Sequence, residues 1–126
     1  MTFSRIDESI AYGALFTAYH LRARAIVALT ESGSTPLWMS RHNIDMPIYA
    51  MTTSRATQRK VALYRNVQPF ELKTDANDRE SVLKAAEELL LARGLVKKDD
   101  MVIMTWGEPM GQTGGTNALK ITKPQT

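Results

Sequence analysis

The sequence predicts an α/β fold: a three-layer sandwich in which helices cover both faces of a five-stranded, mostly parallel sheet. Short apolar runs alternate with segments of helical periodicity over most of the chain, which is the pattern of β–α units. The last apolar run instead follows a Gly-rich connection with no room for a helix. Because parallel strands need a long crossover, we expect this last strand to be antiparallel to its neighbour.

Length and composition fit one compact unit. With 126 residues, of which 44% are hydrophobic, we expect residues 1–126 to form a single domain. Cys is absent, which excludes a disulfide scaffold, a thiolate nucleophile and a Cys-ligated metal. The 16 basic and 13 acidic residues are mixed along the chain, so nucleic acid is not the expected partner. No apolar run approaches the roughly 18 residues of a membrane span, and we expect a cytoplasmic protein without membrane contacts.

The chain opens with an amphipathic helix and a buried strand. Apolar residues recur at helical spacing from about Ile6 to Leu21, and Ser4 is placed to cap this helix. Residues 25–29 read Ala-Ile-Val-Ala-Leu, a continuous apolar run that is too short for a helix. Such a run is typical of a central parallel strand buried on both faces.

Two further helices and one strand follow in the middle of the chain. A helix is predicted over residues 36–43, with Thr35 as its cap and a Pro at its first position. The apolar run at 48–52 predicts the second strand. Ser54 is then placed to cap a helix over residues 55–64, which completes a second β–α unit.

The last part of the chain predicts one more β–α unit and two strands. A strand over 67–72 leads to the most regular helix, over 79–93, with Gly94 placed for the turn that ends it. Apolar runs at 101–106 and 118–122 predict the fourth and fifth strands.

The loop after the first strand is the first candidate binding site, because ligands bind at the carboxyl ends of strands in open α/β sheets. Its hydroxyl groups, its flexible glycine and the free backbone N–H groups of the following helix suit a phosphate group. Hydroxyl residues before a helix are also ordinary capping residues, so capping alone remains the alternative. The candidate residues are Thr30, Glu31, Ser32, Gly33, Ser34 and Thr35.

The Gly-rich connection between the last two strands is the second candidate. It matches no Walker or dinucleotide-binding fingerprint, but its backbone could approach a ligand closely. A long hairpin that uses Gly at positions of positive φ is the alternative. The candidate residues here are Gly107, Thr113, Gly114 and Gly115.

No catalytic or metal-binding set is found. Neither His20 nor His42 has partners at metal-ligand spacing, and there is no nucleophile motif such as G-x-S-x-G. The basic side chains of Arg55, Arg59 and Lys60 are expected on a solvated helix surface, without the interleaved aromatic residues that stack on bases. We therefore assign no catalytic residue and no metal site.

Several segments, in matching order and spacing, resemble the carboxy-terminal domain of pyruvate kinase, most closely the bacterial type II enzymes. The resemblance covers essentially the whole chain. Its segments are Ala25-Ile26-Val27, Thr30 to Thr35, Ser40-Arg41, Pro47 to Thr52, Thr57-Gln58-Arg59, Leu63 to Pro69, Lys98 to Ile103 and Gly115-Thr116-Asn117.

This resemblance implies a regulatory module of a tetrameric glycolytic enzyme. The loop that matches residues 30–35 would hold the phosphate of an allosteric effector, and the loop that matches 107–116 would close over it. The family's catalytic barrel is not part of the resemblance, so catalysis by this chain alone is not expected. The Mg²⁺ and K⁺ ions of the family are expected only in that catalytic part, so no cofactor is expected here.

Two departures from the family bear on the ligand. Ser34 stands where many relatives have an Arg, which removes a bidentate phosphate partner. A Trp and Arg pair for a second phosphate is also not found, so a sugar monophosphate or AMP is expected instead of a bisphosphate. A purely structural oligomerisation module that binds no effector is the alternative function.

Overall fold

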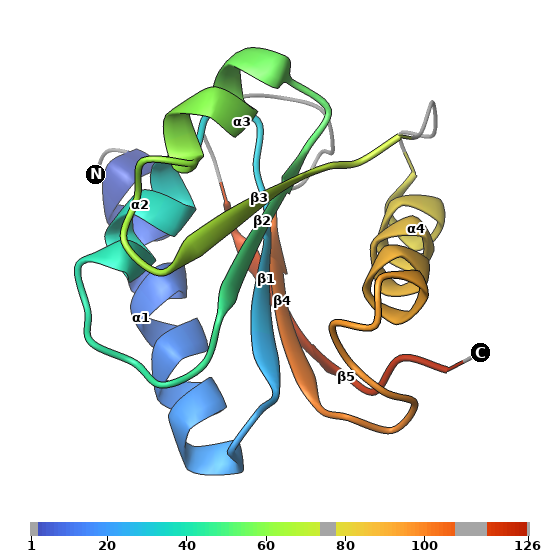
Figure 1. The fold of residues 1–126 in the computed structure, drawn as a ribbon. Coiled ribbons are helices and arrows are strands. Elements are labelled where there is room, and N and C mark those ends of the chain that lie inside the picture. The colour runs from blue at the N-terminus through green and yellow to red at the C-terminus, as the bar shows by residue number, and fades with distance from the viewer. Residues whose placement is uncertain (1–2, 74–77, 108–115, 126) are drawn as a thin grey trace.

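The protein is an α/β sandwich built on one five-stranded sheet (Figure 1). The computed structural model describes residues 3–73, 78–107 and 116–125. Its strands are β1 (Ala25–Leu29), β2 (Ile48–Thr52), β3 (Val67–Glu71), β4 (Val102–Trp106) and β5 (Ala118–Thr122). Their order in the sheet is β3-β2-β1-β4-β5, with β5 antiparallel to β4 and every other pair parallel. The predicted fold class and antiparallel last strand are confirmed.

In the part of the chain that the structure describes, four helices cover the two faces of the sheet. They are α1 (Phe3–Leu21), α2 (Ser34–Ser40), α3 (Arg55–Val61) and α4 (Arg79–Ala92). Figure 1 shows α1, α2 and α3 on one face and α4 alone on the other. Successive side chains of a strand point to opposite faces, so each central strand contributes to two hydrophobic cores. The helices thus form the outer layers of the predicted three-layer sandwich.

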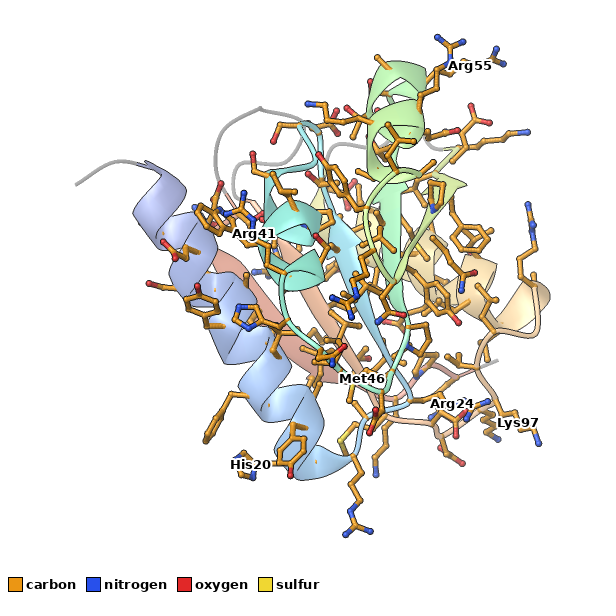
Figure 2. All side chains as sticks on the ribbon, turned by 60° about the vertical axis from the view of Figure 1, so that its left-hand side comes forward. His20, Arg24, Arg41, Met46, Arg55 and Lys97 are labelled. Carbon is orange, nitrogen blue, oxygen red and sulfur yellow. The ribbon has the colours of Figure 1, made fainter. Side chains whose placement is uncertain are left out.

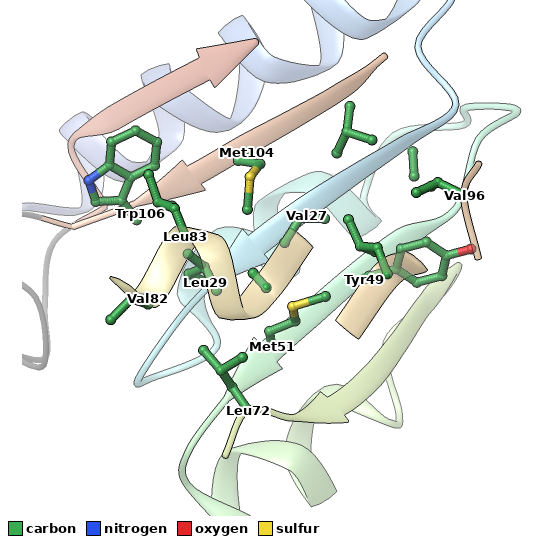
Figure 3. Packing of buried hydrophobic residues seen from close by; sticks show 14 residues of the cluster. Val27, Leu29, Tyr49, Met51, Leu72, Val82, Leu83, Val96, Met104 and Trp106 are labelled. Carbon is green, nitrogen blue, oxygen red and sulfur yellow. The ribbon is translucent and has the colours of Figure 1, made fainter. Parts of the chain in front are cut away.

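The central strands are buried on both faces, as their continuous apolar runs predict. Every residue of β1, β2 and β4 is buried, whereas the edge strands β3 and β5 are partly exposed. Val27, Met51 and Met104 point toward α4, where Figure 3 shows them packed with Leu83. The opposite core forms between α1 and the alternate strand residues, such as Ile103.

Several helix ends differ from the prediction. Helix α2 begins at Ser34, and its N-cap is Gly33, with a φ of 87° and no side-chain cap. Thr35 therefore lies inside the helix, and its assignment as the cap was wrong, because the loop reaches the helix through a left-handed glycine. The helix ends at Ser40 and not near residue 43, and α3 ends at Val61 and not near residue 64.

Other predicted ends are confirmed. The Ser54 hydroxyl accepts a hydrogen bond from the Thr57 N–H at 3.2 Å, as an N-cap does. Gly94 has a φ of 69° directly after the last turn of α4, as predicted. Helix α1 begins earlier than expected, at Phe3, which places Ser4 within the helix.

The sheet has a point where the strand order reverses. From β1 the chain continues to β2 on one side, whereas β4 pairs with β1 on the other side. The parallel register places Ala28 opposite Thr105, so the carboxyl ends of β1 and β4 lie next to each other. Open α/β sheets bind their ligands in the crevice at such a point.

We expect Met51→Ala to destabilise the protein by about 2–5 kcal/mol, because it removes a fully buried side chain and leaves a cavity. Met51 is 1% exposed in the core under α4. Chemical unfolding followed by circular dichroism measures the free energy of unfolding. Leu63→Ala is the control, since Leu63 is 87% exposed and its loss should change stability by less than about 0.5 kcal/mol. Equal losses in the two variants would contradict the assignment of this core.

Candidate functional site

The loop over residues 30–35 is shaped by its own hydroxyl groups. The Thr30 Oγ1 accepts a hydrogen bond from the Gly33 N–H at 2.8 Å, and the Ser32 Oγ accepts one from the Ser34 N–H at 3.3 Å. The hydroxyl oxygens of Ser32 and Ser34 lie 3.0 Å apart. These short-range bonds form a compact turn in which Gly33 takes the left-handed conformation. The two serine hydroxyls remain half-buried at the start of α2.

Helix α3 packs directly against this loop. A Cβ at Gly33 would lie 3.1 Å from the Val61 Cγ1 and 3.5 Å from the Tyr64 hydroxyl oxygen. The Thr57 hydroxyl donates a hydrogen bond to the Glu31 carbonyl at 2.6 Å. The Lys60 Nζ donates one to the Ser32 carbonyl at 2.9 Å. The loop is therefore held by the second β–α unit as well as by its own residues.

Lys60 was expected only on a solvated surface. The structure shows that it also contacts the first candidate loop. Its side chain is exposed, but its ammonium group bonds to the middle of the candidate phosphate loop. The sequence signal that could have indicated this was that residues 30–35 contain no basic side chain, which leaves the loop without a cation of its own. Lys60 and Thr57 are the neighbours from α3 that sequence reasoning did not assign to the site.

A second set of polar contacts joins the two candidate loops to α1. Thr35 is 1% exposed, and its hydroxyl donates a hydrogen bond to the Thr116 Oγ1 at 2.5 Å. The Thr116 N–H in turn donates a hydrogen bond to the carboxyl group of Asp7, on α1. Asp7 is 4% exposed, and this burial raises the pKa of its carboxyl group, although the Thr116 hydrogen bond opposes the shift.

The structure brings together the two ends of the second predicted loop. Gly107 follows β4 directly and is half-buried. The Asn117 N–H donates a hydrogen bond to the Trp106 carbonyl at 3.0 Å, so the two ends of the 107–116 connection meet where β4 and β5 pair. The other predicted residues of this connection, which are Thr113, Gly114 and Gly115, lie outside the described residues.

Glu31 is the only predicted loop residue with an ionisable side chain. It is half-buried, and burial raises the pKa of its carboxyl group. Its backbone carbonyl accepts the hydrogen bond from the Thr57 hydroxyl, so its side chain is the part of this residue that could contact a ligand. A partly desolvated carboxyl group can accept hydrogen bonds from ligand hydroxyl groups.

A cavity of about 890 Å³ lies at the other end of the strands, where β1, β2 and β4 begin. Its lining includes His20, Arg24 and Met46. Figure 2 shows these three residues at the far end of the molecule from Arg55, which begins α3. The lining carries basic side chains such as Arg24 together with acidic ones such as Asp100. This mixture does not select an anion, so the loops at the carboxyl edge remain the candidate site.

The two histidines take part in ring contacts. The ring of His42 lies edge-on to Tyr12, with centroids 4.8 Å apart, and that of His20 lies 4.2 Å from Phe16. Within residues 3–73, 78–107 and 116–125, no three His, Cys, Asp or Glu side chains form a group that could hold a metal ion. No helix in the same ranges has the length and apolar character to span a membrane.

The family model for the pyruvate kinase alpha/beta domain matches residues 8–122 of this sequence. That match spans both loops, all five strands and all but the start of α1. The chain belongs to the pyruvate kinase family. The resemblance of the separate segments, from Ala25 to Asn117, is thereby confirmed.

Individual pyruvate kinases show how much of the enzyme this domain represents. The chain is 38% identical to pyruvate kinase from Buchnera aphidicola subsp. Acyrthosiphon pisum over 125 residues, which cover 96% of this chain and 25% of that protein. It is 38% identical to pyruvate kinase II from Salmonella typhimurium over 122 residues, or 94% of this chain and 25% of that protein. The pyruvate kinase of Geobacillus stearothermophilus is 35% identical over 116 residues, which cover 92% of this chain and 20% of that protein. The chain thus spans about a quarter of the length of these pyruvate kinases or less.

The raised pKa of Asp7 predicts how stability depends on pH. Its carboxyl group binds a proton more tightly in the folded than in the unfolded protein, so the stability it contributes is complete below the ordinary value of 3.8 and is lost as pH rises through the raised pKa. Asp7→Asn keeps an oxygen that can accept the Thr116 hydrogen bond and removes the buried charge. We expect this variant to melt at a higher temperature than the unmodified protein at pH 7.

The difference should shrink as pH falls toward 3.8, because both side chains are then neutral. Thermal unfolding between pH 3.5 and pH 7.5, followed by circular dichroism, measures it. Asp78→Asn is the control, since the exposed carboxyl group of Asp78 accepts hydrogen bonds from Ser81 that lower its pKa, so its effect should change with pH in the opposite direction. A melting difference for Asp7→Asn that does not change with pH would show that its carboxyl group titrates as in the unfolded chain.

Proposed function

We propose that this chain is the effector-binding module of a pyruvate kinase and that residues 30–35 hold the phosphate of a sugar monophosphate or of AMP. One observation carries the proposal: the hydrogen bond between Thr35 and Thr116 joins the two loops that leave the carboxyl ends of β1 and β4. A ligand at this edge would lie near the two residues that form this hydrogen bond. This is where an open α/β sheet of this topology binds its ligand.

The chemistry of the first loop suits a phosphate group. The hydroxyls of Ser32 and Ser34 are half-buried, and each is a donor that can turn toward phosphate oxygens. The ammonium group of Lys60 is held 2.9 Å from the Ser32 carbonyl. This lysine supplies a positive charge beside a loop that has Ser34 where many relatives have arginine. A lysine binds phosphate as a point charge and lacks the bidentate geometry of arginine.

The preference for a monophosphate follows from the number of cations beside the loop. The ammonium group of Lys60 contacts the loop directly, and one ammonium group suits one phosphate. Glu31 lies next to the two serines and would repel a second anionic group when ionised, whereas it can accept a hydrogen bond from a sugar hydroxyl. The proposed ligand is therefore a phosphate carried on a sugar or nucleoside.

In this proposal the chain performs no phosphoryl transfer by itself. The whole enzyme would convert phosphoenolpyruvate and ADP to pyruvate and ATP in glycolysis, in the cytoplasm, with its Mg²⁺ and K⁺ bound elsewhere. The chain would also contribute contacts between the subunits of a homotetramer. Exposed apolar side chains on α1 and β5 support such contacts: Phe16 is 66% exposed, Tyr19 71% and Ile121 48%. Assembly without effector binding is the second candidate function.

Isothermal titration of this chain with ribose 5-phosphate, glucose 6-phosphate, AMP and fructose 1,6-bisphosphate tests the proposal, with inorganic phosphate as the control for a nonspecific anion pocket. We expect selective binding of one monophosphate and loss of that binding in Ser32→Ala, which removes a phosphate-facing hydroxyl. Binding of none of the four compounds would contradict the effector proposal and favour the assembly module. Binding that is undiminished in Ser32→Ala would place the site elsewhere.

The contribution of Lys60 has its own test. We expect Lys60→Gln to weaken binding of the selected monophosphate about tenfold, which corresponds to about 1.4 kcal/mol, because a charge-assisted contact is lost. The matched control is Arg59→Gln, which removes the same charge from the neighbouring, exposed position of α3. It should change affinity less than about twofold. Equal effects of the two variants would reduce the role of Lys60 to general electrostatic attraction.

A further inference from the structure

Asp7 is a buried carboxylate that the proposed phosphate site does not use. It lies near the start of α1, is 4% exposed, and its Oδ1 has no hydrogen-bond partner in the described part of the chain. Burial of a carboxyl group that is only partly hydrogen-bonded costs stability. An Asn or Ser at this position could accept the same backbone hydrogen bond without burying a charge. The position of this carboxyl group therefore points to a function besides stability.

The contacts of Asp7 lead to the end of the second loop. Its carboxyl group accepts a hydrogen bond from the Thr116 N–H. The hydroxyl of the same threonine accepts the hydrogen bond from Thr35, in the first turn of α2. The next residue, Asn117, begins the pairing of β5 with β4 through its bond to the Trp106 carbonyl. Thr116 is thus the point where the connection rejoins the sheet, and it is bonded to two helices there.

We propose that Asp7 is a positioning residue that fixes Thr116 to α1, so that ligand binding at the 30–35 loop and the position of α1 depend on each other. This inference rests on the proposed function, because the ligand is the effector of the 30–35 loop. Thr35 is the last residue of that loop, so a ligand that moves the loop also moves the partner of the Thr116 hydroxyl. Coupling of this kind is reciprocal: whatever shifts α1 changes the affinity of the loops for the ligand by the same factor.

The geometry of α1 gives the coupling a path to the surface. Figure 1 shows α1 (Phe3–Leu21) running alongside the sheet, from the end where β1 finishes to the end where β1 begins. Its inner face is packed in the core through small side chains such as Ala14, which is fully buried, while Phe16 and Tyr19 point outward and are exposed. A hydrogen-bonded helix of 19 residues moves as a unit. A displacement at Asp7 would therefore reach the exposed aromatic face.

Three variants separate positioning from general stability. Asp7→Ala removes the acceptor of the Thr116 hydrogen bond, and Asp7→Asn keeps an acceptor oxygen at the same place. Leu15→Ala is the control, because Leu15 is a buried residue of the same helix that packs in the core below α1 and α2. It should destabilise the protein by leaving a cavity, without changing the contacts of Thr116.

Two measurements are made on each variant. Amide hydrogen exchange by NMR compares the Thr116 N–H with that of Ile103, a core amide, in the absence of ligand. Asp7→Ala should accelerate Thr116 exchange at least tenfold relative to Ile103, whereas Asp7→Asn and Leu15→Ala should leave the ratio within about threefold. In isothermal titration, Asp7→Ala should weaken binding of the selected monophosphate about tenfold, and the other two variants less than about threefold.

Each outcome bears on a different statement. An unchanged Thr116 ratio in Asp7→Ala would overturn the positioning role. A loss of affinity in Leu15→Ala equal to that in Asp7→Ala would show that the effect is general destabilisation, and would also overturn it. If the unmodified chain binds none of the phosphorylated compounds, the proposed function and the coupling both fail, while the exchange of Thr116 still decides whether Asp7 holds the end of the connection.

Discussion

Strands β1 and β4 run side by side in parallel, with Ala28 opposite Thr105, and the location of the candidate site depends on this pairing. Parallel strands end at the same edge of a sheet, so the loops that follow β1 and β4 leave it next to each other. The helices α1 to α3 on one face and α4 on the other bury β1 and β4 completely, which leaves the carboxyl ends of these strands as the place where polar loops begin. Because the two loops are 81 residues apart at their contact between Thr35 and Thr116, only the sheet brings them together.

Polar contacts at this edge are arranged in two sets that share the first loop. Lys60 and Thr57 bind the carbonyl groups of the loop from α3, and Thr35 connects the helix after the loop to Thr116. The first set places the ammonium group of Lys60 beside the first loop. The second set continues to the buried carboxyl group of Asp7. A ligand between the loops would therefore contact groups that are already bonded to three helices, and rigid surroundings of this kind reduce the entropic cost of binding.

The fold could be predicted almost completely, and the candidate site only in part. Each of the nine predicted elements is present, because a fully buried strand and an amphipathic helix each leave a local pattern of apolar residues. Several helix ends nevertheless differ from the prediction. Thr35 shows where local reasoning fails. Hydroxyl residues near a helix start have several possible partners, and here Gly33 is the cap while Thr35 bonds to the second loop. Lys60 was placed on the right helix, but nothing in its spacing indicated which neighbour its ammonium group would contact.

By itself, the sequence determined the order of helices and strands, the antiparallel last strand and the family, and it predicted two candidate binding loops. These follow from apolar periodicity, from the length of each connection and from ordered segment matches, all of which can be read along the chain. Only the tertiary structure decided that Asp7, Thr35 and Thr116 form one set of hydrogen bonds, and that Lys60 reaches the first loop. A hydrogen bond between residues distant in sequence leaves no periodic pattern, since it depends on one donor meeting one acceptor after the sheet has formed.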